Sequence, residues 1–225
     1  MEFLIFGVAA AVAILLLYLA WKIEEQRRLK LRGLAQSMGW QYSPHDSLGL
    51  LGLPFPIFSR GSSRKVSNVL WGPRGDHELR VFEYQYKERR TNSRGQGSTT
   101  TYRFTCASTQ IDVAAPHTSI ERETLLSRLA DVAGFRDIEF ESEEFNRHLQ
   151  VKSADERFAT YLIDPRMMEW LLHAGPWSFE LTGPFVLARL NRRLKPEELP
   201  RLIDAIEGFT ARVPRVLYDV YGGAG

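Results

Sequence analysis

The stretch from Glu144 to Leu172, EFNRHLQVKSADERFATYLIDPRMMEWLL, holds a dense group of side chains that could do chemistry. Two carboxylates that face one another, such as Glu144 and Asp155, could act as a general acid and a general base. Charged residues at helix ends have a structural alternative, because a carboxylate at a helix N-terminus accepts hydrogen bonds from free backbone N–H groups. The spacing of the residues distinguishes the two interpretations.

The spacing within this stretch predicts two short helices. Ser153 followed by Glu156 fits a capping box, and the apolar residues that follow recur at helical intervals, which predicts a helix over 154–163. Asp164 followed by Pro165 predicts the start of the second helix. The side chains left without a structural role, and therefore the first candidates for a binding site, are Glu144, Asn146 and Arg147.

The sequence contains no Gly-x-Ser-x-Gly elbow, no Walker lysine loop and no Gly-x-Gly-x-x-Gly fingerprint. Its five histidines lack the spacings of metal ligands, and its single cysteine, Cys106, excludes a disulfide framework and a cysteine-rich metal site. We therefore predict no catalytic, cofactor-binding or metal-ligating residue. An enzyme stays open only as a membrane-bound hydrolase or transferase, in which the fold would bring Glu144, Arg147 and a histidine into one pocket.

A second group of candidate binding residues lies in the polar segment 87–99, which contains two glycines between two alternating segments. We expect a long hairpin loop there. Its cations could contact anionic lipid head groups or could simply be solvated. The formal net charge of +2 and the lack of aromatic residues among these cations argue against a nucleic-acid partner. The candidate cations are Arg89, Arg90 and Arg94.

Residues 3–21, FLIFGVAAAVAILLLYLAW, contain no charged side chain. A helix of this length extends roughly 28 Å, close to a bilayer core of about 30 Å, so we predict a single uncleaved transmembrane anchor over 1–21. Cations follow the run and none precedes it, which places the N-terminus outside and the remainder of the protein in the cytoplasm. Residues 22–38 are expected to continue as a juxtamembrane helical stalk that docks on the domain through a narrow apolar stripe.

The elements that must position these side chains predict an α+β fold, with a mainly antiparallel sheet and packed helices, because strand signals come in runs. We expect one cytoplasmic domain over 39–225, with a division into two lobes near 135 as an alternative. Alternation over 78–87 predicts a half-buried strand.

Three further elements are predicted from local signals. Thr118 followed by Glu121 has capping-box spacing and predicts a helix before Gly134. Thr182-Gly183 lies between two apolar segments and predicts a hairpin. Pro196 predicts the start of a final helix that reaches roughly residue 212.

Two motifs carry a resemblance to a known group of proteins, namely Phe140-Glu-Ser-Glu-Glu-Phe-Asn-Arg and Asp164-Pro-Arg-Met-Met-Glu-Trp-Leu. Together with Val151, Asp155 and Phe158-Ala159, they resemble uncharacterised single-span membrane proteins of actinobacteria that carry a bacterial domain of unknown function. The resemblance implies no activity and no catalytic residue. The leading hypothesis is a membrane-anchored cytoplasmic interaction module, and the alternatives are the hydrolase or transferase above and a domain that senses anionic lipid at the inner leaflet.

Overall fold

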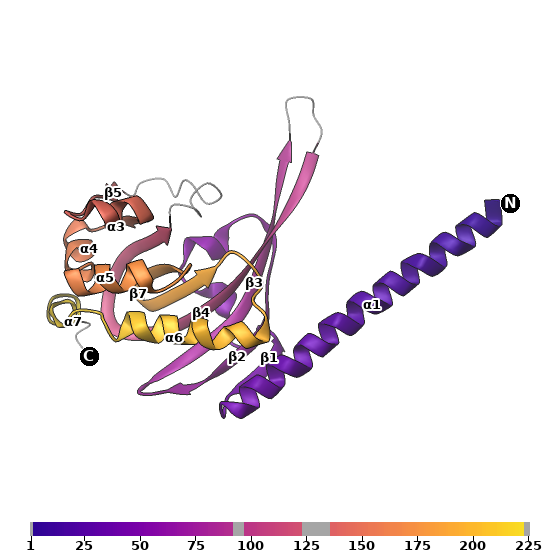
Figure 1. Ribbon diagram of the computed structural model, residues 1–225, viewed down its shortest axis with the longest axis horizontal. Coiled ribbons are helices and arrows are strands. Elements are labelled where there is room, and N and C mark those ends of the chain that lie inside the picture. Colours follow the sequence, from indigo (N-terminus) through magenta and orange to yellow (C-terminus); the bar gives the residue numbers. More distant parts are fainter. Residues whose placement is uncertain (1, 92–96, 123–135, 223–225) are drawn as a thin grey trace.

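The computed structural model describes residues 2–91, 97–122 and 136–222 of the 225-residue chain, and describes no side chain for residues 2–5, 7–10 and 136. Figure 1 shows a sheet with helices packed on it and a long first helix that projects from this body. The elements, in chain order, are α1 (Glu2–Ser37), β1 (Gln41–His45), η1 (Leu50–Gly52), η2 (Pro56–Ser59), β2 (Ser62–Arg74), β3 (His77–Thr91), β4 (Gly97–Arg122), β5 (Arg136–Ile138), α3 (Glu143–His148), β6 (Leu149–Ser153), α4 (Glu156–Leu162), α5 (Pro165–His173), β7 (Ser178–Leu190), η3 (Pro196–Glu198), α6 (Leu199–Thr210) and α7 (Arg215–Tyr221).

The described strands form one seven-stranded sheet in the order β1-β2-β3-β4-β6-β5, with β7 paired to β4. Every pairing between them is antiparallel. The prediction of an α+β fold with a mainly antiparallel sheet is therefore confirmed. The sheet and its larger core both draw residues from either side of position 135.

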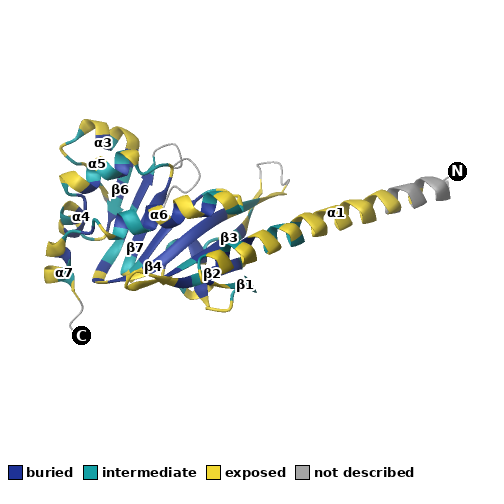
Figure 2. Ribbon diagram, turned by 60° about the horizontal axis from the view of Figure 1, so that its bottom comes forward, coloured by how far each residue is buried: buried dark blue, intermediate teal, exposed yellow. Residues whose placement is uncertain are grey.

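Both faces of the sheet are covered, and the central strands are largely buried (Figure 2). One face packs against the base of α1 and against α3 to α7, and the other packs against the short helical turns η1 and η2. Strand β3 is therefore buried on both sides, with Val81 toward the first cluster and Phe82 toward the second. The prediction of a half-buried strand over 78–87 is wrong, because the base of α1 covers the face of Val81 and Glu83 that we expected to be solvated, while η1 and η2 cover the aromatic face.

The segment 87–99 forms a hairpin, as predicted, but most of it is strand. Strands β3 and β4 stay paired from Arg80 with Ser108 out to Thr91 with Gly97. The long loop that we expected is therefore replaced by a paired arm that extends beyond the body of the sheet. Cross-strand hydrogen bonds satisfy its polar backbone groups, which a long loop would leave to water.

Residues 118–122 are strand rather than helix, so that part of the helix predicted from Thr118 and Glu121 is wrong. Thr118 pairs with Ser153 on β6 and with Leu181 on β7. The preference of a capping box for a helix start is small compared with the backbone hydrogen bonds that neighbouring strands offer on both edges of this segment. The remainder of the predicted helix, 123–133, lies outside the described residues.

The hairpin predicted around Thr182-Gly183 is also wrong, because β7 is a single strand that runs along β4. Gly183 has φ of 56°, a backbone conformation that favours glycine. The register between the two strands shifts on either side of the pair Ala115 with Gly183. The glycine thus accommodates an irregularity in a continuous strand instead of reversing the chain.

Two of the helices in the 144–172 stretch follow the prediction. The side chain of Asp164 accepts a hydrogen bond from the backbone N–H of Met167 at 2.7 Å, which caps α5. Helix α4 is capped by Asp155 rather than by Ser153, whose hydroxyl accepts from the backbone N–H of Asp155. The final helix is present as η3 followed by α6, and α7 was not predicted.

Helix α1 is continuous to Ser37 and is followed by Gly39, which has φ of 70°. Leu31 and Ala35 on its last turns are buried in the core. Among the residues that the structure describes, none forms a helix with the length and apolar character needed to cross a bilayer. Residues 3–5 and 7–10 of the predicted span lie outside the side chains described. The predicted transmembrane helix is thus without support from the described residues.

Candidate functional site

The structure places the predicted residues Glu144, Asn146 and Arg147 on the short helix α3, which the sequence had not predicted. Asn146 has a structural role: its side-chain oxygen accepts from the backbone N–H of Phe140 at 3.0 Å and its amide donates to the Phe140 carbonyl. Glu144 and Arg147 are exposed. Neither lines any of the four cavities described for this protein, so none of these cavities is the pocket that the hydrolase hypothesis requires around them.

The predicted cations of segment 87–99 lie on the β3–β4 arm. Arg89 is paired with Thr99 and Arg90 with Ser98, so the two side chains leave the arm on opposite faces. Arg94 lies outside the described residues. Arg89 shares its face of β3 with Glu83, which belongs to a different group of charged residues at the base of α1.

This group begins with a β-bulge in β2. Between the pairs Ser67 with Glu83 and Leu70 with Val81, strand β2 contains one residue more than β3. Asn68 lies in this bulge with φ of 53° and is almost fully buried. Asparagine tolerates this left-handed conformation better than most residues. The bulge directs its amide toward Glu83, to which it donates at 3.0 Å.

Glu83 is the centre of the group, and only 8% of the residue is exposed. A carboxylate this deeply buried needs partners, because unpaired charge is costly to remove from water. Arg27 on α1 donates to Glu83 Oε1 through Nε at 2.8 Å and also through Nη2. Arg193, in the connection between β7 and η3, donates to Glu83 Oε2 at 2.6 Å. The carboxylate therefore joins the first helix, the sheet and the C-terminal region.

A second carboxylate, Glu24, extends the same network. The guanidinium group of Arg193 donates two hydrogen bonds of 2.8 Å each to the Glu24 carboxylate, in the bidentate geometry that is typical of such pairs. The hydrogen bonds from Arg193 hold the pKa of Glu24 below its usual value, against the opposing effect of partial burial. We call Glu24, Arg27, Asn68, Glu83 and Arg193 the stalk clamp.

The connection that carries Arg193 is held by Thr105 of β4. Its hydroxyl donates to the carbonyl of Arg192 at 3.1 Å and accepts from the backbone N–H of Leu194 at 2.9 Å. Arg27 also donates to the Leu194 carbonyl at 2.5 Å. These contacts hold Arg193 over the sheet and fix its direction toward Glu24 and Glu83.

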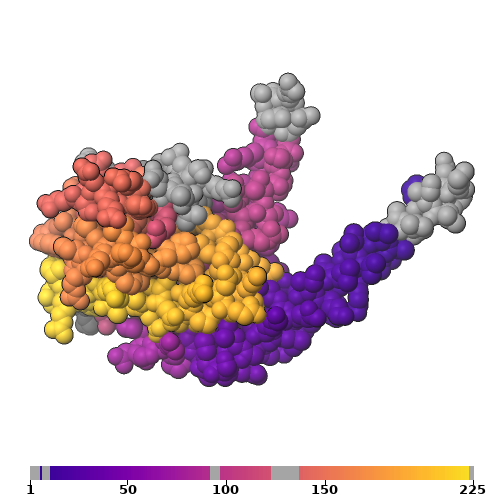
Figure 3. Space-filling model, in the orientation of Figure 1, coloured from indigo at the N-terminus to yellow at the C-terminus, as the bar shows by residue number. Residues whose placement is uncertain are grey.

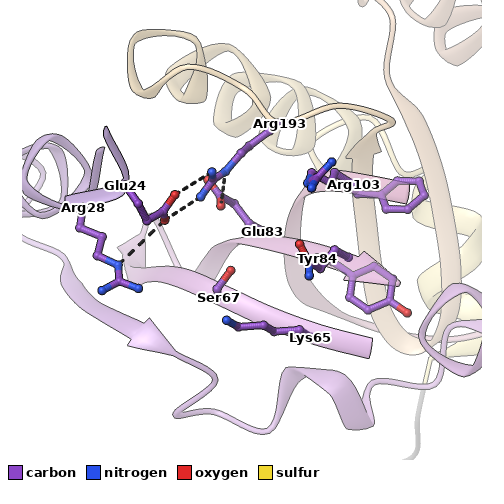
Figure 4. Close-up of a pocket in the computed structure, with 10 residues that line it drawn as sticks. Glu24, Arg28, Lys65, Ser67, Glu83, Tyr84, Arg103 and Arg193 are labelled. Carbon is purple, nitrogen blue, oxygen red and sulfur yellow. Dashed lines mark hydrogen bonds and ion pairs between the residues drawn. The ribbon is translucent and has the colours of Figure 1, made fainter. Parts of the chain in front are cut away.

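A cavity of about 230 Å³ opens beside the stalk clamp (Figure 4). Its walls come from α1, from the three adjacent strands β2, β3 and β4, and from Arg193. The Tyr84 hydroxyl lies on the other face of the sheet, where it donates to the Ile57 carbonyl at 2.9 Å, and Ser67 has no histidine beside it in the lining. The cavity thus offers charged groups suited to binding, and its lining contains no base-activated nucleophile. The lining residues are Glu24, Arg28, Lys65, Ser67, Glu83, Tyr84, Gln85, Arg103, Phe104 and Arg193.

A separate buried charge group lies inside the sheet. Arg189 of β7 donates to Glu180 at 2.8 Å and to Glu121 of β4, and is itself almost fully buried. Burial opposes its charge, but the two carboxylates raise the pKa of Arg189 above its usual value. Burial raises the pKa of Glu121, with Arg189 opposing the shift. No cavity is described beside this group, so we assign it to the cohesion of β4 with β7.

Cys106 is completely buried in the core, and this burial raises the pKa of its thiol. Within the described ranges, no three histidine, cysteine, aspartate or glutamate side chains lie close enough together to hold a metal ion.

Sequence reasoning missed every residue of the stalk clamp. One signal was available, since Glu83 shares a face of its strand with the apolar residues Leu79 and Val81, and a buried carboxylate needs a cationic partner. The sequence did not indicate which cations would serve, because Arg27 and Arg193 are 56 and 110 residues away from it.

Comparison with known proteins adds information on the fold. No protein-family model matches the chain, and no curated protein gives a significant match. Among solved structures, the chain is similar to the mycobacterial trehalose monomycolate transport factor A, TtfA, with a TM-score of 0.58 and 14% sequence identity. The match covers 84% of this chain and 95% of that chain. At this identity the likeness shows a shared fold.

Proposed function

We propose that this protein is a membrane-tethered interaction module, which holds a cytoplasmic domain in a defined orientation so that it can bind a protein partner of a membrane transport system. The proposal includes no reaction. Its membrane part depends on the uncharged run 3–21 and on the cations that follow it. Its transport part is supported by the likeness in fold to a protein described as a transport factor.

The observation that carries the proposal is the stalk clamp. An enzyme that only needs to stay near a membrane can use a flexible tether. Here Arg27, six residues beyond Trp21, is bonded to the buried carboxylate of Glu83, and Arg193 links that carboxylate to Glu24. A helix fixed in this way sets both the height and the rotation of the domain relative to a bilayer. Such positioning is useful when the domain must meet a partner that is itself embedded in the membrane.

The shape of the molecule is consistent with this role. Figure 3 shows α1 and the β3–β4 arm as two separate projections from a compact body. Among the described cavities, none is lined by a cysteine, and the one lined by a histidine, His173, is a shallow surface site on α5 and α6. These observations favour binding over catalysis.

The test compares three full-length proteins in native membranes: the natural sequence, Arg27→Ala with Arg193→Ala, and Arg74→Ala with Arg80→Ala. The last pair removes two arginines whose ion pairs, with Glu207 and Glu78, do not involve α1, and it serves as the control. We expect all three proteins to resist alkaline extraction from the membrane, and protease added to intact cells to spare the domain.

Crosslinking in the membrane, followed by purification, should then recover the same membrane partner with the natural sequence and the control. The clamp variant should recover it several-fold less. Extraction of the natural protein by alkali would disprove the anchor. Equal recovery by the clamp variant would show that a fixed stalk is not what the partner requires.

A further inference from the structure

We propose that the cavity at the base of α1 binds a phosphate group, either of an anionic phospholipid head group or of a free phosphate ester. This inference is separate from the protein partner proposed above, and only its lipid form depends on the membrane anchor.

The floor of the cavity is a row of side chains across three adjacent strands. Lys65 of β2 pairs with Gln85 of β3, and Gln85 pairs with Arg103 of β4. Residues directly opposite one another in antiparallel strands point to the same face, with Cβ atoms about 5 Å apart. The two cations therefore flank the amide of Gln85 on the face that carries α1. Figure 4 labels Lys65 and Arg103 beside the cavity.

The charges around the cavity do not balance. The carboxylates of Glu24 and Glu83 are satisfied by Arg27 and Arg193, two cations for two anions. Three further cations then remain at the cavity, namely Arg28, Lys65 and Arg103.

Of these three cations, Arg28 forms only long ion pairs, and Lys65 and Arg103 have no carboxylate partner among the described residues. Lys65 and Arg103 form no ion pair with any residue that the structure describes. The nearest carboxylate oxygens to Arg28, on Glu24 and Glu25, are 3.9 Å away, and its buried Nε has no hydrogen-bond partner among the described groups. A buried donor without an acceptor is costly, and an anion in the cavity would supply one.

A phosphate group fits this donor set. A guanidinium group can donate two parallel hydrogen bonds to two oxygens of one phosphate, and the ammonium group of a lysine adds a compact positive charge beside the phosphate. The side chains of Gln85 and Ser67, which also line the cavity, offer neutral hydrogen-bond donors. The volume of about 230 Å³ exceeds the roughly 30 Å³ of a water molecule several-fold, so a group of several atoms can enter.

The position of the cavity along α1 favours a lipid head group as one source of this phosphate. Glu24 and Arg28 follow Trp21 by about 5 and 10 Å along the helix axis. The head-group layer on each side of a bilayer core is about 5–8 Å thick. If the run 3–21 spans the membrane, the cavity lies at the depth of the lipid phosphates. The same face of β3 continues outward with Lys87 and Arg89, which extends the cationic surface along the arm.

The test uses full-length protein in detergent and two charge-matched double variants. Lys65→Gln with Arg103→Gln alters the cavity, and Arg166→Gln with Arg215→Gln removes two exposed cations from α5 and α7. Because all four side chains are exposed, we expect native near-UV circular dichroism from both variants. The single variants Lys65→Gln and Arg103→Gln replace the double variant if it does not fold.

Two measurements are made on each protein. Calorimetric titration with inorganic phosphate at constant ionic strength reports free phosphate, and native mass spectrometry with phosphatidylglycerol against phosphatidylcholine reports the head group. We expect the natural protein to bind, and the cavity variant to bind at least roughly tenfold more weakly, because it loses two charge-assisted donors to the phosphate. The control should bind as the natural protein does.

If the protein binds inorganic phosphate but does not retain phosphatidylglycerol, the ligand of the cavity is a soluble phosphate ester. If it retains phosphatidylglycerol alone, the ligand is a lipid head group. Binding of both would show that the cavity recognises the phosphate group itself. The proposal is overturned if the natural protein binds neither, or if the cavity variant binds as well as the control. Because the phosphate titration needs no bilayer, failure of the membrane anchor would leave its result unaffected.

Discussion

The carboxylate of Glu83 should account for a measurable part of the stability of the protein, and Glu83→Gln tests this. The substitution keeps the size of the side chain but replaces one acceptor oxygen by an NH₂ donor and removes the negative charge. Arg27 and Arg193 both point hydrogen-bond donors at this group. In the variant, donors face a donor, and one of the two cations has no carboxylate within reach.

The magnitude follows from the exposure of the partners. Removing one member of a fully buried ion pair costs about 3–5 kcal/mol. The side chain of Arg27 is 14% exposed, but that of Arg193 is 35% exposed and keeps its bidentate contact with Glu24. Solvent screening therefore reduces the cost, and we expect a loss of roughly 2–3 kcal/mol. For a protein of this size that loss lowers the melting temperature by about 5–10 °C.

The assay is thermal unfolding of the full-length protein in detergent, with Glu88→Gln as the control. Glu88 lies on the same strand, but its ion pair with Arg90 spans 3.9 Å and the Arg90 side chain is 71% exposed, so we expect a change within about 0.5 kcal/mol. Arg27→Gln combined with Glu83→Gln should cost less than the sum of the two single variants, because each removes the partner of the other. The account of the clamp is refuted if Glu83→Gln is no more destabilising than Glu88→Gln.

Three further outcomes are expected. Asn68→Ala should be less stable than Asn68→Gly by about 1 kcal/mol in thermal unfolding, since both lose the bonds to Glu83 but only alanine is strained at φ of 53°; equal stabilities would contradict the bulge geometry. Asn146→Ala should lower the free energy of urea unfolding by about 2 kcal/mol through its two bonds to Phe140, without weakening crosslinks to a membrane partner; loss of those crosslinks in a folded variant would instead make Asn146 a contact residue. The pKa of Glu24 is lower in the folded protein than in the unfolded chain, so its ionised carboxylate stabilises the fold fully above the ordinary glutamate pKa of about 4.3. This stabilisation is lost as the pH falls through the lower folded pKa, so Glu24→Gln should make the melting temperature less dependent on pH in the acid range. An unchanged dependence on pH would contradict the contact with Arg193.

Several elements were predictable from the sequence because their causes are local. Asp164 followed by Pro165 marks the start of α5 through one side-chain hydrogen bond and one fixed φ angle, both within a single turn. Phe104 and Cys106 fall on one buried face because side chains alternate along any strand. Fold class followed in the same way from the order of such segments.

Other elements depended on partners that local patterns do not reveal. Thr118 and Glu121 have the spacing of a helix start, yet they lie on β4 because β6 and β7 pair with both of its edges. Gly183 has the turn chemistry of a hairpin, yet it lies inside β7 because β4 continues beside it on both sides. In each case pairing along a whole strand outweighs a preference set by two or three residues.

The candidate sites divide along the same line. From the sequence, the unassigned polar residues were Glu144, Asn146 and Arg147, because nothing nearby in the chain explained them. The structure accounts for Asn146 through Phe140 and assembles a different group, in which Glu24 meets Arg193 across 169 residues. Sequence alone determined which residues carry charge and which run is uncharged. Only the tertiary structure decided which charges meet, because ion pairs depend on distance in space and the folded sheet brings these residues together.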